Sequence, residues 1–253
     1  SMEMPSVPKG SGRHPIALVV ISANNLAASS AFYSTLFAWQ LQKMSPELTV
    51  VIPPAGPMTA LRSNSPDGFP GIVPYIGVAN VDAMLAQVVA AGGTIERATW
   101  SLPMVGKLAR FKDTSGTIYG LTDLGSPGGT PHIPMPFGSN PKPPTGVICS
   151  LEMYAADGTA SGFFGNQFGW STLPTMPQFT AFDAGAGVGG VFQSHTPALP
   201  ALAYIYVADV ETKIAEIESA GGKRLGDPMR MRGMGCFGYF KDPSDTSMGL
   251  IGP

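Results

Sequence analysis

The amino-acid sequence predicts an α+β fold made of two similar domains in tandem, and two observations support this. The ending FKDTSGTIYGLTD at 111–123 returns as FKDPSDTSMGLIG at 240–252, which is 129 residues later. Each copy also has the same order of predicted elements, a strand, a helix and further strands, twice over. Because the repeat has the length of a whole domain, it indicates a duplicated domain and not a solenoid of short units.

The repeat extends far beyond these endings. Residues 75–121 align without a gap on 204–250, and FYSTLFAW at 32–39 matches FFGNQFGW at 163–170. A stretch rich in proline and glycine separates the copies and is typical of an extended linker. The predicted organisation is therefore a disordered tail at 1–13 that begins with an expression scar, a first domain at 14–123, a linker at 124–145 and a second domain at 146–252.

The elements of the first copy follow from local patterns. A continuous apolar run predicts a buried strand, Asn24 or Asn25 can cap the helix that follows it, and Gly92 suits the end of a second helix. The predicted elements are, in order, a strand at 16–22, a helix from the asparagines to about residue 39, strands at 48–54 and 58–63, a strand at 75–81, a helix at 82–93 and a closing hairpin at 107–123.

The repeated FKDxS motif is interpreted as a turn. Asp113 and Asp242 each begin a four-residue segment whose composition suits a type I β-turn, and Pro243 stands at the second position of one of them, which proline favours. We therefore expect both aspartates to be turn residues and not catalytic acids.

Composition and charge exclude several classes of partner. The net charge is −2 without a basic stripe, which argues against nucleic acid, and no apolar run of about 18 residues predicts a membrane span. The first residues lack the apolar segment of a secretory signal, and Cys149 and Cys236 suit reduced thiols, so a cytoplasmic location is expected. Charged residues are only 13% of the chain, which predicts surface covered at a domain–domain or homodimer contact, or reflects a composition rich in Gly, Ala and Pro.

The order and spacing of these motifs carry a family likeness. A strand, then FYxxLFxW or its variant, then YIxVxxV with AGG, then FxDxxxxxxGL resembles the vicinal oxygen chelate superfamily. That superfamily contains glyoxalase I, bleomycin-resistance proteins and extradiol dioxygenases. The resemblance implies that each half is one domain of two βαβββ modules, which curl a mixed sheet into a cup, and that the chain is a tandem of two such domains.

The resemblance also implies where a metal would bind. Enzymes of this family usually hold a divalent metal through His, Glu or Gln at three places in the cup. Carried over by position, these places fall at Leu18 and Cys149 on the first strands, at Val73 and Leu202 on the middle strands, and at Gly120 and Gly249 on the last strands. Since none of these residues offers an imidazole or a carboxylate, we predict no metal and no other cofactor, and we expect the two glycines to leave room in the cup.

The same register suggests residues that line the cups. Tyr75 and Tyr204 lie two positions after the middle metal positions, so strand parity turns them toward the same face, where they offer a polar tip. Cys149 is a further cavity candidate. It is expected to be a small buried hydrophobe, and a nucleophilic pair with His195 is the alternative.

A methionine–arginine alternation at 229–232 leaves two readings open. If Arg230 and Arg232 face the cup, they provide a clamp for a carboxylate or phosphate. In the other reading Met229 and Met231 fill the interior and the arginines are solvated.

Three functions are compatible with these observations. The preferred one is a glyoxalase- or bleomycin-resistance-like protein that lacks the family metal ligands and binds a small organic molecule in a cup-shaped cavity. The second is a metal-independent lyase, isomerase or hydroxylase-like enzyme of the same superfamily, with Tyr, Arg, Glu or Cys as acid–base groups. The third is a scaffold for protein interaction.

Overall fold

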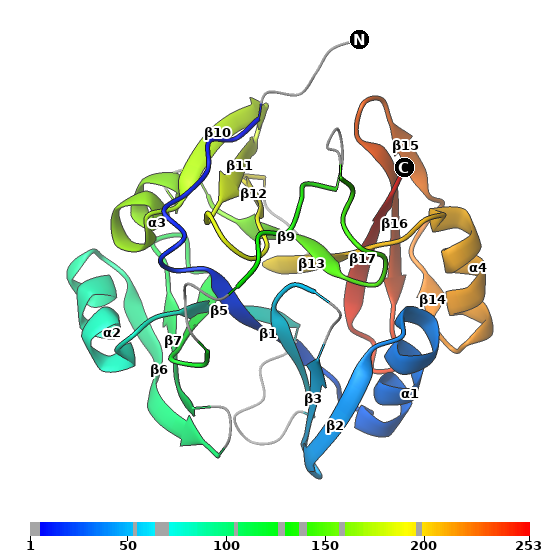
Figure 1. Cartoon of the computed structure of the whole chain (residues 1–253), viewed down its shortest axis with the longest axis horizontal. Coiled ribbons are helices and arrows are strands. Elements are labelled where there is room, and N and C mark those ends of the chain that lie inside the picture. The colour runs from blue at the N-terminus through cyan, green and yellow to red at the C-terminus, as the bar shows by residue number, and fades with distance from the viewer. Residues whose placement is uncertain are drawn as a thin grey trace.

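A computed structural model describes residues 6–52, 55–63, 71–103, 106–125, 130–136, 141–156, 160–195 and 199–253. Each half of the chain builds one mixed sheet, and the two sheets lie one above the other in Figure 1. In the N-terminal half the elements are β1 (Ile16–Ser22), α1 (Leu26–Phe37), β2 (Gln40–Ser45), β3 (Leu48–Ile52), β4 (Met58–Arg62), β5 (Ile72–Gly77), α2 (Val81–Ala90), β6 (Thr94–Leu102), β7 (Gly106–Lys112) and β8 (Ile118–Thr122).

The C-terminal half repeats this order. Its elements are β9 (Ile148–Tyr154), α3 (Ala160–Phe168), β10 (Ser171–Met176), β11 (Phe179–Asp183), β12 (Gly190–Gln193), β13 (Ala201–Tyr206), α4 (Val210–Ser219), β14 (Lys223–Arg224), β15 (Met229–Met231), β16 (Gly235–Lys241) and β17 (Ser247–Gly252). The segments β14 and β15 together take the place that β6 has in the first half, since both pair with β16 as β6 pairs with β7.

The strand order confirms the predicted α+β fold of two βαβββ modules per half. It is β2-β3-β4-β1-β5-β8-β7-β6 in one sheet and β10-β11-β12-β9-β13-β17-β16-β14 in the other, with β15 beside β16. In both sheets the first strand lies at the centre, parallel to the last strand of its own module and antiparallel to the first strand of the next. Each sheet therefore joins two modules edge to edge into one curled surface.

Local sequence explains how the helices begin and end. The side chains of Asn25, Asn80 and Asp209 accept hydrogen bonds from backbone N–H groups in the first turns of α1, α2 and α4. Gly92 follows α2 with φ +102°, a left-handed conformation in which a side chain would be strained.

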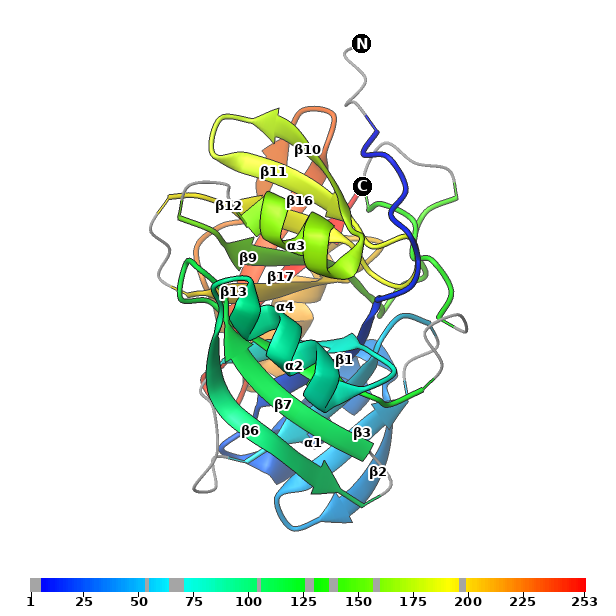
Figure 2. The same ribbon diagram turned by 90° about the vertical axis from the view of Figure 1, so that its left-hand side faces the viewer.

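The repeated aromatic motifs meet across the two halves. Phe240 of β16 lies 5.9 Å from Phe32 and 6.3 Å from Phe37 of α1, measured between ring centroids. Phe111 of β7 contacts α3 in the same way, at 6.2 Å from Phe168. Figure 2 shows α2 and α3 beside each other along one side of the molecule. The FKD ending of each half thus packs against the FYxxLFxW helix of the other, and one hydrophobic core spans both halves.

Each FKDxS motif is a turn that fixes one half to the other. The Oδ1 atom of Asp242 accepts from the N–H groups of Ser244 and Thr246 at 2.9 and 3.0 Å, and the Thr246 hydroxyl donates to the carbonyl oxygen of Ser22 at the end of β1. The same contacts recur around Asp113 in the other half. The turn interpretation of both aspartates is therefore correct.

The N-terminal segment differs from the expected disordered tail. Within residues 6–13, Ser11 N–H donates to the Gly169 carbonyl and Gly12 N–H to the Ala184 carbonyl, both at 2.9 Å. Trp170 adds a third bond, from its Nε1 to the carbonyl oxygen of His14 at 2.8 Å. These bonds to the C-terminal half order the segment, although its composition alone suggested none.

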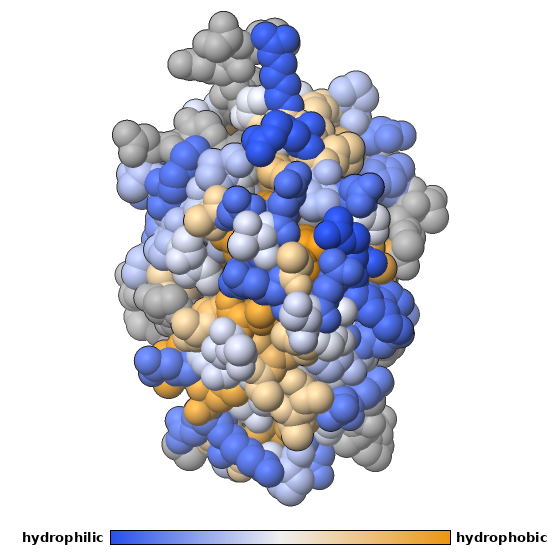
Figure 3. Space-filling view, turned by 90° about the vertical axis from the view of Figure 1, so that its right-hand side faces the viewer, coloured by the Kyte–Doolittle hydropathy of each residue, from blue (hydrophilic) through white to orange (hydrophobic). Residues whose placement is uncertain are grey.

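The surface is mixed in character. Figure 3 shows the side that carries α1 and α4, where orange apolar residues reach the surface between blue hydrophilic ones. The shared core is a domain–domain contact, one of the explanations expected for the low charge content, and a homodimer stays a prediction. Within the described residues, no helix has both the length and the apolar character needed to cross a membrane.

Candidate functional site

Three positions form a row across the floor of each cup. In the N-terminal sheet Leu18 of β1 pairs with Tyr75 of β5, which pairs with Gly120 of β8. In the C-terminal sheet the matching row is Ser150, Tyr204 and Gly249. Two of the predicted positions in the cups are therefore wrong by one or two residues along their strands.

The first correction concerns the first strand of the C-terminal half. Both first strands have a bulge at the same place, at Ala17 in β1 and at Cys149 in β9, so Ser150 and not Cys149 is the counterpart of Leu18. The prediction counted back from the helix motif, and the segment between strand and helix is one residue shorter in the C-terminal half. The second concerns the middle strand, where the tyrosines and not Val73 or Leu202 share the row with the glycines.

The expectation that the two glycines, Gly120 and Gly249, leave room in the cup is wrong. A Cβ atom on Gly249 would collide with the ring of Tyr204, and a Cβ atom on Gly120 would collide with the ring of Tyr75. The glycines are therefore required because a tyrosine ring lies over each of them.

The rows do not suit a divalent metal. They offer a leucine or serine, a tyrosine whose pKa is raised by burial, and a glycine, in place of the imidazole and carboxylate ligands that such metals prefer. Elsewhere in the described part of the chain, no three His, Cys, Asp or Glu side chains are grouped so that they could hold a metal ion.

The N-terminal cup is filled by its own side chains. Leu18, Val73, Tyr75 and Leu108 form a buried cluster against which Trp100 packs, and only about 20 Å³ remains between them. The predicted cavity residue Tyr75 thus contributes to a packed core.

Ionic groups also close this cup. The guanidinium of Arg97 lies 3.7 Å from the ring centroid of Trp100, and Arg110 forms an ion pair with Glu96. These contacts hold the indole in place, so the described side chains of the N-terminal cup leave little room for a ligand between them.

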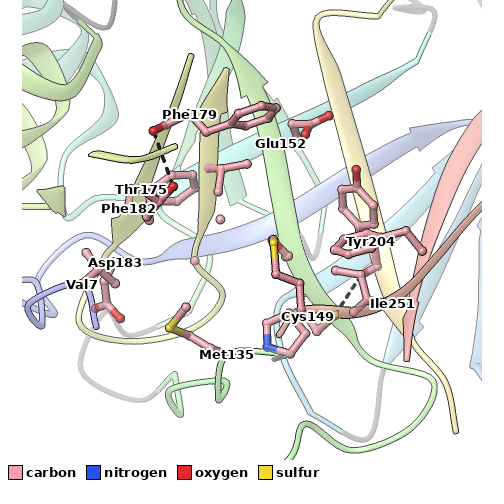
Figure 4. A pocket seen from close by; sticks show the side chains of 18 of the residues that line it. Val7, Met135, Cys149, Glu152, Thr175, Phe179, Phe182, Asp183, Tyr204 and Ile251 are labelled. Carbon is pink, nitrogen blue, oxygen red and sulfur yellow. Dashed lines mark hydrogen bonds between the residues drawn. The ribbon is translucent and has the colours of Figure 1, made fainter. Parts of the chain in front are cut away.

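The C-terminal cup contains a cavity of about 310 Å³. Strands β9, β11, β13, β15 and β16 contribute to its wall, together with Val7 of the N-terminal segment and residues 132–136 of the predicted linker. Most of the wall is apolar, and its aromatic and methionine side chains are Phe179, Phe182, Tyr204, Phe237, Tyr239, Met135, Met176, Met229, Met231 and Met234. Figure 4 shows Glu152 and Cys149 at different heights of β9 and Tyr204 on the neighbouring β13.

Two of the predicted cavity residues lie at this cavity. Tyr204 lines it, and its hydroxyl lies 3.2 Å from the hydroxyl of Tyr239. Cys149 also borders it, because the bulge turns its side chain away from the strict alternation of the strand. The Cys149 thiol donates to the Tyr204 carbonyl at 3.5 Å, and burial raises its pKa, which disfavours the thiolate of a nucleophile. His195 packs edge-on against Phe179, 5.7 Å away, and not against Cys149.

Arg230 and Arg232 do not line the cavity. In the β15–β16 ladder Met229 faces Phe237, whereas Arg230 faces Cys236 on the opposite side of the sheet. The Arg230 guanidinium contacts the carbonyl oxygen of Pro253, and Arg232 is exposed in the turn after β15. The arginines thus lie outside the cup, as in the second of the two arrangements considered, and Met229 and Met231 border the cavity, although Met229 is 56% exposed and does not fill an interior.

One cavity residue was not among the predicted site residues. Glu152 lies two positions after Ser150 on β9 and faces the same side of the sheet. Its carboxylate makes no hydrogen bond or ion pair with the described residues, and burial raises its pKa. The pKa of Tyr204 is raised mainly by burial, and the negative charge of Glu152 is the second largest cause. Strand parity counted from Ser150 would have found Glu152, but counting back from the helix motif pointed to Cys149, because the segment between strand and helix is one residue shorter in this half.

A second acidic residue at the cavity has a structural role. The Oδ2 atom of Asp183 lies 2.9 Å from Nε2 of His132, and its Oδ1 atom accepts from the N–H groups of Gly185 and Gly10 at 2.6 and 3.1 Å. Asp183 thereby fastens the linker and the N-terminal segment to the edge of the cup, and its hydrogen-bonding capacity is used.

Comparisons with known proteins agree on the fold. No family model matches the chain. The protein described as "Putative glyoxylase CFP32" from Mycobacterium bovis is 23% identical over 258 residues and covers 93% of both chains. The Mn(II)-bound glyoxalase from Novosphingobium aromaticivorans superposes with a TM-score of 0.66 at 16% identity, over 94% of this chain and 81% of its own. The 2,3-dioxygenase LapB from Pseudomonas sp. KL28 gives 0.64 at 13% identity, over 97% and 93%. The chain therefore has the same fold as these glyoxalase and 2,3-dioxygenase structures.

Proposed function

We propose that this member of the glyoxalase and dioxygenase fold binds a small, largely apolar organic molecule in its C-terminal cup, without a metal. The observation that carries the proposal is the difference between the cups: one leaves about 20 Å³ and the other about 310 Å³. Small-molecule sites have volumes of ~300–1,000 Å³ and apolar walls with a few polar groups. The C-terminal cup meets both criteria.

The polar groups of the cavity suit binding. The Tyr204–Tyr239 hydroxyl pair and the Glu152 carboxylate lie in a wall made mainly of aromatic and methionine side chains. Such a wall holds an apolar body by its shape, and the few polar groups orient it.

The test is binding of the neutral fluorescent probe N-phenyl-1-naphthylamine to the purified chain. We expect saturable fluorescence enhancement with one site per chain. In the N-terminal cup, Leu18 and Trp100 occupy the positions that Ser150 and Met229 have in the C-terminal cup. The double variant Ser150→Leu/Met229→Trp therefore fills the C-terminal cup with the same two side chains. If this variant folds and binds the probe as well as the wild type does, the cavity is not the site.

A metal-independent enzyme is the second candidate, and one observation favours it. A carboxyl group with a raised pKa shares the cavity with a pair of tyrosine hydroxyls, an arrangement that supports proton transfer. The two candidates separate once a ligand is known. A binding protein returns the compound unchanged after long incubation, as followed by NMR, whereas an enzyme converts it and loses that conversion on Glu152→Gln.

A further inference from the structure

We infer that the ligand of the C-terminal cup is a lipophilic cation, an apolar molecule with a protonated amine that pairs with the Glu152 carboxylate. This inference rests on the proposed function and adds the charge class of the ligand. It starts from a carboxylate that the protein itself leaves without a partner.

The charge of the cavity is negative and uncompensated. Glu152 and Asp183 are its two carboxylates, and Asp183 is paired with His132. No lysine or arginine is among the described residues that line the cavity. His195 influences Glu152 from outside it, but this effect is smaller than that of burial. A carboxylate held in apolar surroundings without a counter-charge is costly, so a cationic ligand supplies what the wall lacks.

The surroundings of Glu152 also suit a cation. Tyr204 and Tyr239 are close enough for its charge to raise the pKa of both hydroxyls, and Phe179 adds a third aromatic ring to the same wall. Aromatic faces attract an ammonium group, and the attraction grows when the site is shielded from water. A carboxylate beside several aromatic rings is therefore complementary to an amine on an apolar body.

The N-terminal cup shows that folding does not require this carboxylate. Val20 is the residue equivalent to Glu152: it pairs with Val73, two residues before Tyr75, as Glu152 pairs with Leu202, two residues before Tyr204. Arg110 stands at the position of Tyr239, each directly opposite the row glycine. The filled cup thus has an arginine that is ion-paired with Glu96, whereas the open cup has a carboxylate without an ion pair among the described residues, although the two sheets share their strand order.

The experiment uses three naphthalene probes of similar size whose polar substituents are cationic, neutral and anionic: 2-naphthylmethylamine, 2-naphthalenemethanol and 2-naphthoate. Their dissociation constants are measured on the full chain by isothermal titration calorimetry at pH 8. We expect the amine to bind about tenfold more tightly than the alcohol, the gain of one charge-assisted hydrogen bond. The carboxylate probe should bind most weakly, because it repels Glu152.

Two variants locate this preference. Glu152→Gln keeps the size of the side chain and should bring the amine to the affinity of the alcohol, with the alcohol itself changed less than about twofold. Glu152→Val introduces the residue of the N-terminal cup and should do the same. The matched control Glu211→Gln removes an exposed carboxylate from α4 that does not line the cavity, and should keep the preference.

The outcomes separate this inference from the function on which it rests. Equal affinity for amine and alcohol, or a preference that survives Glu152→Gln, overturns the inference and leaves small-molecule binding intact. Tighter binding of 2-naphthoate overturns it as well. Failure of all three probes and of N-phenyl-1-naphthylamine to bind refutes the proposed function itself.

Discussion

The two cups have the same strand order and register, yet one is a packed core and the other a cavity. Three exchanges at equivalent positions account for much of the difference: Leu18 becomes Ser150, Val20 becomes Glu152, and Trp100 becomes Met229. The first cup gains hydrophobic stabilisation from filling its own space, whereas the second leaves apolar wall available to another molecule. After duplication, a fold of this kind can keep one copy for stability and use the other for binding.

The largest expected effect comes from making the second cup like the first. Ser150→Leu/Met229→Trp should weaken binding of N-phenyl-1-naphthylamine at least about 100-fold, because displaced apolar contacts worth ~3 kcal/mol are lost. Fluorescence titration measures this, and circular dichroism checks that the variant is folded. The reciprocal variant Leu18→Ser/Trp100→Met is the control and should bind at the C-terminal cup like the wild type.

That reciprocal variant makes a prediction of its own. Emptying the N-terminal cup should lower the free energy of unfolding by about 3–5 kcal/mol, the range for large-to-small changes in a core, and urea unfolding measures it. If the change costs nothing, the filled cup does not serve as a core. If the variant binds a second molecule of probe per chain, the side chains of Leu18 and Trp100 are what keeps the N-terminal cup of the wild type closed to ligands.

The sequence was sufficient to predict the fold, because the evidence for it occurs twice. The domain-sized repeat, the helix caps and the FKDxS turns each specify local structure from a few residues, and two copies agree. The site was harder to predict. The segment between the first strand and the helix is one residue shorter in the C-terminal half, which displaced the predicted register by one, and in a strand such a shift exchanges the two faces. This is why Glu152 was missed as a cavity residue.

Other features of the site depend on contacts between distant segments. Val7 and His132 reach the cavity from outside the two predicted domains, and nothing in their local sequence indicates this. Which face of β15 turns inward is set by its pairing with β16, so the positions of Arg230 and Met229 could not be decided from their alternation alone.

The copies also differ at the FKDxS turns, where the two aspartates are buried. Burial raises the pKa of Asp113 to about 6, and its Oδ2 atom has no hydrogen-bond partner among the described residues. A native pKa above the unfolded value means that the native state holds the proton more tightly. The stability that this group contributes is complete below pH 4 and is lost as the pH rises through about 6.

Asp113→Asn should therefore stabilise the protein at pH 8 by about 2 kcal/mol, and this advantage should vanish near pH 4. The asparagine Oδ1 atom can still accept from Ser115 and Thr117, so the turn is kept. Urea unfolding of the wild type and the variant at pH 4, 6 and 8 measures the difference. An advantage that is the same at all three pH values would show that the buried charge is not its cause.

The smallest expected effect concerns the partner that Asp242 has and Asp113 lacks. The Tyr33 hydroxyl donates to Oδ2 of Asp242 at 2.8 Å, whereas the corresponding residue of α3 is Phe164. Tyr33→Phe leaves a buried carboxylate oxygen without its donor, so the free energy of unfolding at pH 8 should fall by about 1–2 kcal/mol.

Phe164→Tyr/Tyr119→Met transfers the same pair of residues to the other half, since Met248 holds the place of Tyr119 beside Asp242. It should lower the pKa of Asp113 and flatten the pH dependence of stability between pH 4 and 8. If Tyr33→Phe is neutral and the transferred pair leaves that pH profile unchanged, the hydroxyl is not what distinguishes the two turns. In that case the burial of each aspartate in the core, and not a hydrogen bond from a tyrosine, would determine its pKa.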